Sequence, residues 1–131
     1  MAALLDALKT RIETLAITGW TVDLSYMSDD TDKRIAVYEY QGRPADHGFG
    51  VPGMQFVRPG IQVVVRSSAL DYAGARAIAE LVFQDFPKIQ ATSISGNYVT
   101  MVQPLQAPFY LRRDDRQRPY VVANYIFEVK Q

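Results

Sequence analysis

The sequence predicts an α+β fold, a mostly antiparallel β-sheet with two main helices packed on one face, a long Gly/Pro-rich loop and a β-hairpin extension. Three observations support this prediction. The 131 residues are 48% apolar and 21% charged, which suits one domain over 1–131 with its own core. Two segments carry apolar residues at the spacing of a helix. Several shorter segments alternate apolar and polar residues, as strands do.

Helical spacing occurs near the N-terminus and again in the middle of the chain. Residues 2–16 place apolar side chains three and four apart, namely Leu4, Leu5, Leu8, Ile12 and Leu15. The segment 69–86 is the stronger helix, with Ser68 as a candidate N-cap and Pro87 as its stop. We expect its buried stripe to consist of small and branched residues, namely Ala73, Gly74, Ala77, Ile78, Leu81 and Val82.

Strand patterns fill most of the remaining chain. Residues 20–26 and 34–40 alternate on either side of the polar turn SDDTDK, which is consistent with a hairpin. The segment PGIQVVVRS predicts a central strand, because apolar residues occupy both of its faces. Two short strands are expected around Gly96-Asn97, and a long one over 120–130.

Between these strands, residues 41–54 (QGRPADHGFGVPGM) contain four Gly and two Pro. That composition predicts a loop with no regular structure, and loops of this length in compact domains are commonly functional or disordered. We expect the loop to be poorly packed in an isolated subunit and to order against a neighbour. Its apolar anchors would be Phe49, Val51 and Met54.

Charge and residue usage argue against several classes of function. Fourteen basic residues balance fourteen acidic ones, so the surplus that general DNA binding requires is missing. There is no Cys, and the N-terminal segment reads as neither signal peptide nor membrane span, which suggests synthesis in the cytoplasm. His47 is the one histidine and has no partner pattern for catalysis or metal binding. We therefore expect no enzyme activity and no cofactor.

The segment RRDDRQR packs six charges into residues 112–118. A catalytic pair formed by Asp114 and Asp115 is disfavoured, because neighbouring arginines favour ionised carboxylates, whereas acid catalysis needs a protonated one. A single-stranded nucleic-acid patch is disfavoured too, because the two aspartates leave a surplus of about two charges. Interleaved signs suit ion pairs with another protein or a solvated loop better.

Taken in order, four segments of the chain have a familiar arrangement. They are ALLDALKTRI, IAVYEYQGRP, PGIQVVVRSSALDYAGARAIAELVFQDF and QAPFYLRRDDRQRPYVVANYIFEV. Together they resemble the minor capsid or tail-terminator proteins of tailed bacteriophages, over nearly the whole chain. None of these motifs is catalytic.

The resemblance implies a virion protein at the neck that forms a ring, expected to be a hexamer. The ring would cap the head-proximal end of the tail tube, stop its polymerisation and join the head. Its partners would be other copies of itself, the tail-tube protein and a head–tail connector, with DNA passing through the lumen without specific binding and no membrane involved.

In that reading the charged segment is a hairpin tip and the 41–55 segment a mobile arm, both contacting neighbours. The implied contact residues of the tip are Arg112, Arg113, Asp114, Asp115, Arg116 and Arg118. In such a ring the acidic turn could face the lumen through Asp29, Asp30 and Asp32, but an ordinary exposed hairpin turn is the favoured interpretation.

Two alternatives remain open. The chain could be another connector, neck or tail-tube component of the same apparatus. From a different class, it could be a small binding module that uses the 41–55 loop as a lid.

Overall fold

The computed structural model describes residues 2–15, 18–47 and 55–130. The helices and strands in this part are, in chain order, α1 (Ala2–Glu13), β1 (Thr21–Leu24), β2 (Arg34–His47), β3 (Gln55–Arg66), α2 (Tyr72–Asp85), the short 3₁₀ helix η1 (Phe86–Lys88), β4 (Thr92–Ile94), β5 (Asn97–Pro104), β6 (Phe109–Arg113) and β7 (Pro119–Lys130). This is the predicted α+β class, with more sheet than helix.

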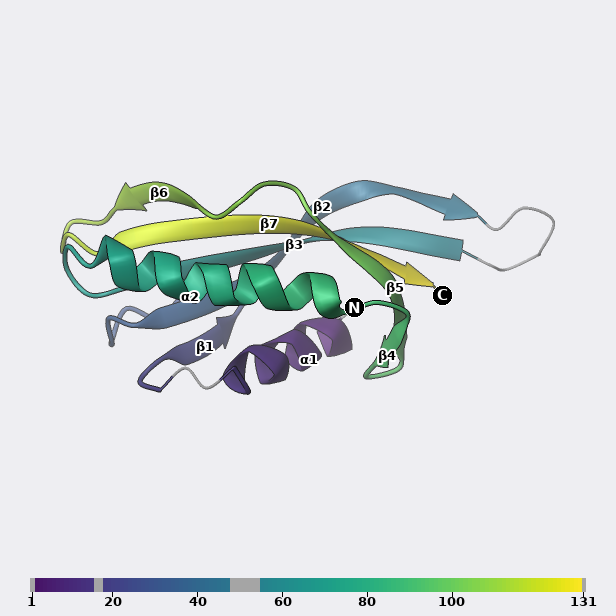
Figure 1. Cartoon of the computed structure of the whole chain (residues 1–131), viewed down its shortest axis with the longest axis horizontal. Coiled ribbons are helices and arrows are strands. Elements are labelled where there is room, and N and C mark those ends of the chain that lie inside the picture. Colours follow the sequence, from purple (N-terminus) through teal and green to yellow (C-terminus); the bar gives the residue numbers. More distant parts are fainter. Residues whose placement is uncertain (1, 16–17, 48–54, 131) are drawn as a thin grey trace.

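The described strands form one curled sheet in the order β1-β2-β3-β7-β5-β4 (Figure 1). Strand β6 also pairs with β7, on the stretch that β5 leaves free: β5 lies along the second half of β7 and β6 along the first half. All the pairs are antiparallel except β1 with β2. The long strand β7 is therefore the element to which most of the sheet is joined.

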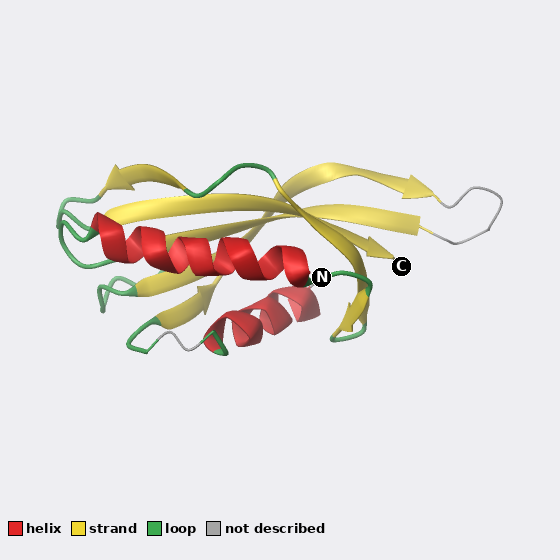
Figure 2. Ribbon diagram, viewed as in Figure 1, coloured by secondary structure: helices red, strands yellow, loops and turns green. Residues whose placement is uncertain are grey.

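Both helices cover the same face of the sheet (Figure 2), as expected from the sequence. Side chains from α1, α2 and the facing side of the strands form one apolar cluster. Strand β7 contributes alternate residues, all buried, namely Val121, Ala123, Tyr125, Phe127 and Val129. Tyr125 packs on Phe86, with ring centroids 5.0 Å apart. No helix in the described ranges is long and apolar enough to cross a membrane.

The strand predictions hold for the second half of the chain. Strand β3 is central, and Val64 is buried on the face opposite Val63 and Val65. Strands β4 and β5 form the expected hairpin around Ser95 and Gly96, whose φ angles of 47° and 81° are those of a tight turn between twisted strands.

The predicted hairpin between residues 20–26 and 34–40 is wrong, because β1 and β2 run parallel. Thr21 pairs with Arg34 and Leu24 with Val37. A parallel connection usually needs a dozen or more residues to bring the chain back to the start of the first strand. Here β1 has only four residues, so the link of residues 25–33 is long enough to return.

The predicted loop over 41–54 is wrong for its first half, since residues 41–47 continue β2. Two register shifts between β2 and β3 accommodate the Gly and Pro residues. At Gly42 an added Cβ would lie 1.8 Å from the carbonyl oxygen of Arg58, so a bulge with a glycine is needed there. Pro44 lies beyond the part of β2 that β1 pairs with, where its missing N–H costs no ladder bond on that side. Phe49, Val51 and Met54 lie outside the described residues.

Helix α2 is where predicted but is rotated. Asp71, and not Ser68, caps it: the Asp71 carboxylate accepts a 3.0 Å hydrogen bond from the Gly74 amide. The buried face consists of Ala75, Ile78, Ala79 and Val82, whereas Ala73, Ala77 and Leu81 of the predicted stripe are exposed. The sequence predicted the wrong face because alanine fits both the buried and the exposed face of a helix. Only the branched residues Ile78 and Val82 mark the buried face.

Two alanines on α2 form a matched pair for testing this orientation. Ala79→Leu should lower the free energy of unfolding by about 1–3 kcal/mol, because the added atoms overpack a full core. Ala77→Leu should be nearly neutral, because Ala77 is exposed. Denaturant titration of both variants measures the difference, and equal effects would contradict the orientation.

Candidate functional site: a charged cluster at one end of the sheet

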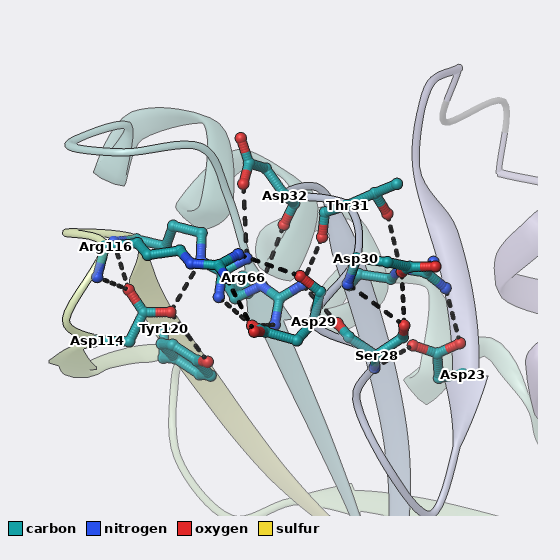
Figure 3. A network of polar contacts seen from close by, with 12 residues as sticks. Asp23, Ser28, Asp29, Asp30, Thr31, Asp32, Arg66, Asp114, Arg116 and Tyr120 are labelled. Atoms are coloured by element: carbon teal, nitrogen blue, oxygen red, sulfur yellow. Dashed lines mark hydrogen bonds and ion pairs between the residues drawn. The ribbon is translucent and has the colours of Figure 1, made fainter.

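Charged side chains gather at the end of the sheet where β2 and β7 begin and β3 ends. Arg34, Arg66 and Tyr120 are neighbours there in the strand register. The 25–33 link and the turn between β6 and β7 close over them (Figure 3). We call this the charged cluster. Its residues are Asp23, Ser28, Asp29, Asp30, Thr31, Asp32, Arg34, Arg66, Asp114, Arg116, Arg118 and Tyr120.

Arg66 holds the acidic turn in place. Its side chain is 2% exposed, and its guanidinium donates to the carbonyl oxygens of Ser28, Thr31 and Asp32. A buried guanidinium without acceptors is strongly unfavourable, so these three carbonyl groups satisfy donors that β3 carries into the interior. The turn is thereby fixed above the end of β3.

Arg118 joins the acidic turn to the β6–β7 turn. Its Nε donates to Asp114 at 2.8 Å, and its Nη1 and Nη2 contact Asp32 and Asp29, respectively. The Asp114 carboxylate also accepts 3.0 Å bonds from the backbone N–H groups of Arg116 and Arg118, which closes the turn. Only 3% of the Arg118 side chain is exposed, so its charge is used inside this subunit.

A third arginine secures the other side of the acidic turn. Arg34 donates to Asp23 at 3.0 Å, to Asp30 at 2.6 Å and to the Thr31 hydroxyl at 2.8 Å. Asp23 is buried in β1 and also accepts from the Ser28 amide at 3.0 Å. These bonds explain how the link from β1 folds back onto the start of β2, as the parallel pairing requires.

The cluster places arginines inside and carboxylates outside. Asp29, Asp30 and Asp32 are 67%, 71% and 55% exposed, whereas Arg66 and Arg118 lie beneath them. The hydrogen bond from Arg118 lowers the pKa of Asp29. The hydrogen bond from Ser28 lowers the pKa of Asp30. Both carboxylates are therefore ionised at neutral pH.

The remaining pKa shifts have the same origin. Burial acts to raise the pKa of Asp114, but bonds from Arg118 and Arg116 outweigh it and lower that pKa. Burial acts to lower the pKa of Arg118, but its bonds to Asp29 and Asp114 raise that pKa above its ordinary value. Arg118 thus stays charged although it is buried.

The outer side chains of the 112–118 segment differ from Arg118. The Arg112 guanidinium lies 4.3 Å from the centre of the Tyr120 ring, in a cation–π contact. Arg116 is 60% exposed and reaches Asp29 at 3.4 Å. Arg113 and Asp115 make no side-chain hydrogen bond or ion pair with any described residue.

The structure thus brings together two motifs that the sequence presents 80 residues apart, the acidic turn and the charged tip. Sequence reasoning missed Asp23, Arg34 and Arg66, which hold the cluster together. Each could have been suspected from its position, because Asp23 interrupts a short apolar strand and both arginines flank strands of the core. The predicted contact role of the tip residues remains a prediction.

The cluster offers no catalytic chemistry. A general acid or base needs a pKa near the working pH, whereas the carboxylate pKa values that shift here are all lowered. Among the described residues, no three acidic or histidine side chains are grouped to hold a metal ion. The charged cluster instead holds the acidic turn and the β6–β7 turn together and leaves carboxylates exposed at the surface.

Replacing the buried arginine should destabilise the fold, whereas replacing its exposed neighbour should not. Arg118→Met leaves Asp114 without its main partner and should cost about 3 kcal/mol of unfolding free energy at pH 7. Arg116→Met is the matched control and should cost less than about 1 kcal/mol, because that pair is exposed. Denaturant titrations of the two variants make the comparison.

The pH dependence of the unfolding free energy tests whether lost charge pairing is what destabilises Arg118→Met. The lowered pKa values of Asp29 and Asp114 stabilise the fold above about pH 5, and this stability is lost as the pH falls below about 3.9 towards the lower folded values. The cost of Arg118→Met should therefore shrink below about pH 4. A cost that stayed constant down to pH 3 would mean that packing, and not charge, is responsible.

One family model matches most of the chain, and one solved structure shares its fold. The model of the bacteriophage tail terminator protein family matches residues 12–131. A chain in the solved virion of a native gene transfer agent particle superposes with a TM-score of 0.66 and 13% identity, over 98% of this chain and 94% of that one. At that identity the superposition establishes the fold alone. A search of curated proteins found no match. The chain therefore belongs to the bacteriophage tail terminator proteins, which makes it a structural component of a phage-like virion that assembles with other virion proteins, and not an enzyme.

Proposed function

We propose that the chain terminates the tail. Copies of it form a ring, expected to be hexameric, on the head-proximal end of the tail tube. The ring stops further polymerisation of the tube and provides the surface that a head–tail connector binds. The observation that carries this proposal is the family match over residues 12–131, which includes every strand of the sheet.

The charged tip supplies a contact surface in this proposal. Asp114 and Arg118 hold the turn in shape from inside, so they act on a partner through the turn and not directly. The tip has four exposed charged side chains, Arg112, Arg113, Asp115 and Arg116. In this proposal they meet a neighbouring subunit, the tail tube or the connector. Charged side chains at the rim of an interface determine the orientation and the choice of the partner more than they stabilise the subunit itself.

The acidic turn has the properties of a surface that DNA slides past. Its three aspartates are exposed, and the arginines that balance them are buried beneath, so phosphate groups approaching the turn meet carboxylates first. We place Asp29, Asp30 and Asp32 towards the lumen on this ground.

DNA retention tests that placement. The assembled wild-type ring should not retain duplex DNA at low salt, whereas a ring with Asp30→Lys and Asp32→Lys should bind it with an affinity that falls as salt rises. Both changes keep Asp29, the main partner of Arg118 in the turn. Salt-dependent retention by the wild-type ring in a filter-binding assay would rule out the placement.

The lid alternative loses part of its basis, because residues 41–47 of the expected 41–55 loop belong to β2 and residues 48–54 lie outside the described residues. No observation favours a tail-tube role over termination.

Tail length tests the main proposal. In the phage that encodes the chain, deleting its gene should give tubes of uncontrolled length without heads, as seen by electron microscopy. Arg113→Glu with Arg116→Glu should give the same defect while leaving the melting temperature within about 2 °C, because exposed pairs contribute little to folding.

A control with an equal change of charge is Lys9→Glu with Lys88→Glu, on α1 and η1 and away from the tip. This control should produce tails of normal length. Normal tails with attached heads in the absence of the protein would defeat the proposal.

A further inference from the structure

An open groove of about 470 Å³ lies beside the charged cluster, lined by Leu70, Tyr72, Tyr110, Arg113 and Pro119. Its walls come from the start of α2 and from the β6–β7 hairpin. The Tyr72 and Tyr110 rings meet edge to face, with centroids 6.1 Å apart, and both rings are more than 40% exposed. The volume is in the range of pockets that take up apolar groups of a ligand or partner.

The groove presents an apolar side chain at a conformational cost. Leu70 has a φ of 60°, in the left-handed region that a leucine seldom adopts, and it is 68% exposed. Its amide donates to the carbonyl oxygen of Gln117 at 2.8 Å, which holds it against the hairpin turn. Strain that keeps a leucine in water points to a contact made outside this subunit.

Arg113 adds polar specificity. Arg113 lines the groove, and its guanidinium makes no hydrogen bond or ion pair with the described residues. An occupant of this groove should therefore combine apolar side chains with acceptor oxygens for the guanidinium.

We propose that the groove binds residues 48–54 of a neighbouring copy of the same chain. This inference rests on the proposed ring. The segment reads GFGVPGM, with four apolar side chains, Phe49, Val51, Pro52 and Met54, and no charge. Its backbone carbonyl groups, spaced by Gly and Pro, supply acceptors for Arg113.

Chain length excludes the segment of the same copy. The groove lies at the Arg66 end of β3, whereas His47 and Gln55, the described residues that flank 48–54, pair at the opposite end of β3. Those ends are eleven residues apart, or about 36 Å at 3.3 Å per residue. Seven residues fixed at both ends can extend out and back by about 12 Å at most. The segment must therefore reach another molecule.

The geometry also suits a closed ring. A contact in which one end of a subunit binds the opposite end of the next is heterologous, and such contacts generate rings when the rotation closes. Each subunit would give one segment and receive one, so no groove in a closed ring stays empty.

Cysteine cross-linking tests the pairing, since the natural chain has no Cys. Val51→Cys in one preparation and Leu70→Cys in another should give disulfide-linked dimers only when the two are mixed and oxidised. The double variant should give a ladder that ends at the ring size. Leu81→Cys is the control for Leu70→Cys, because Leu81 is also exposed but lies about 13 Å further along α2 from Tyr72.

The outcomes separate this inference from the proposed function. Cross-linking and assembly are both measured on the purified protein and on tails assembled with the variants. Native mass spectrometry gives the mass of the assembled rings. Rings or terminated tails without cross-links at Leu70, or with equal cross-links at Leu81, would overturn the groove pairing and leave termination standing. Absence of any assembly by the wild-type chain in solution and in tails would overturn both.

Arg113→Glu tests the contribution of the guanidinium to binding in the groove independently of the cross-links. It should weaken self-association by about tenfold or more without changing the melting temperature, as loss of a central arginine at an interface does. Unchanged self-association would contradict the role of the guanidinium.

Discussion

Burial of two arginines, Arg66 and Arg118, is the constraint on which one end of this molecule depends. Strand β3 carries Arg66 to the interior, and the turn before β7 carries Arg118 there. A buried guanidinium needs acceptors for all its donors. The 25–33 link supplies most of them, through backbone carbonyl groups to Arg66 and carboxylates to Arg118. Fixing this link returns the chain to the start of β2, which makes β1 parallel and brings α1 over the sheet.

The same constraint decides which charges remain for function. Because buried arginines use Asp114 and the inner side of the acidic turn, the outer surface carries exposed carboxylates on one side and the free groups Arg113 and Asp115 on the other. A chain with no net charge thus acquires distinct charged surfaces. Such separation suits the proposed ring, in which one surface contacts neighbouring subunits and another faces the DNA.

The two ends of the sheet differ in a way that matters for assembly. One end carries the charged cluster, the apolar groove and a leucine in a strained conformation. At the other end, β2 ends at His47 and β3 begins at Gln55, the residues that flank the uncharged, apolar sequence of residues 48–54. In the proposed ring, a subunit with unlike ends would make head-to-tail contacts, and the length of β2 and β3 would set the distance over which they repeat.

The sequence by itself determined the elements and the class of protein: apolar periodicity marked both helices and the long strand β7, and the order of the motifs indicated a tail terminator. Local pattern could not determine the direction of β1, the extent of β2 or the rotation of α2. The reasons are physical. Bulges let Gly42 and Pro44 stay in a strand, alanines fit either face of a helix, and the pairing of the acidic turn with Arg118 depends on strands that meet only in the folded chain. Only the tertiary structure could show that two distant charged motifs form one cluster, because a salt bridge is set by distance in space and not by spacing along the chain.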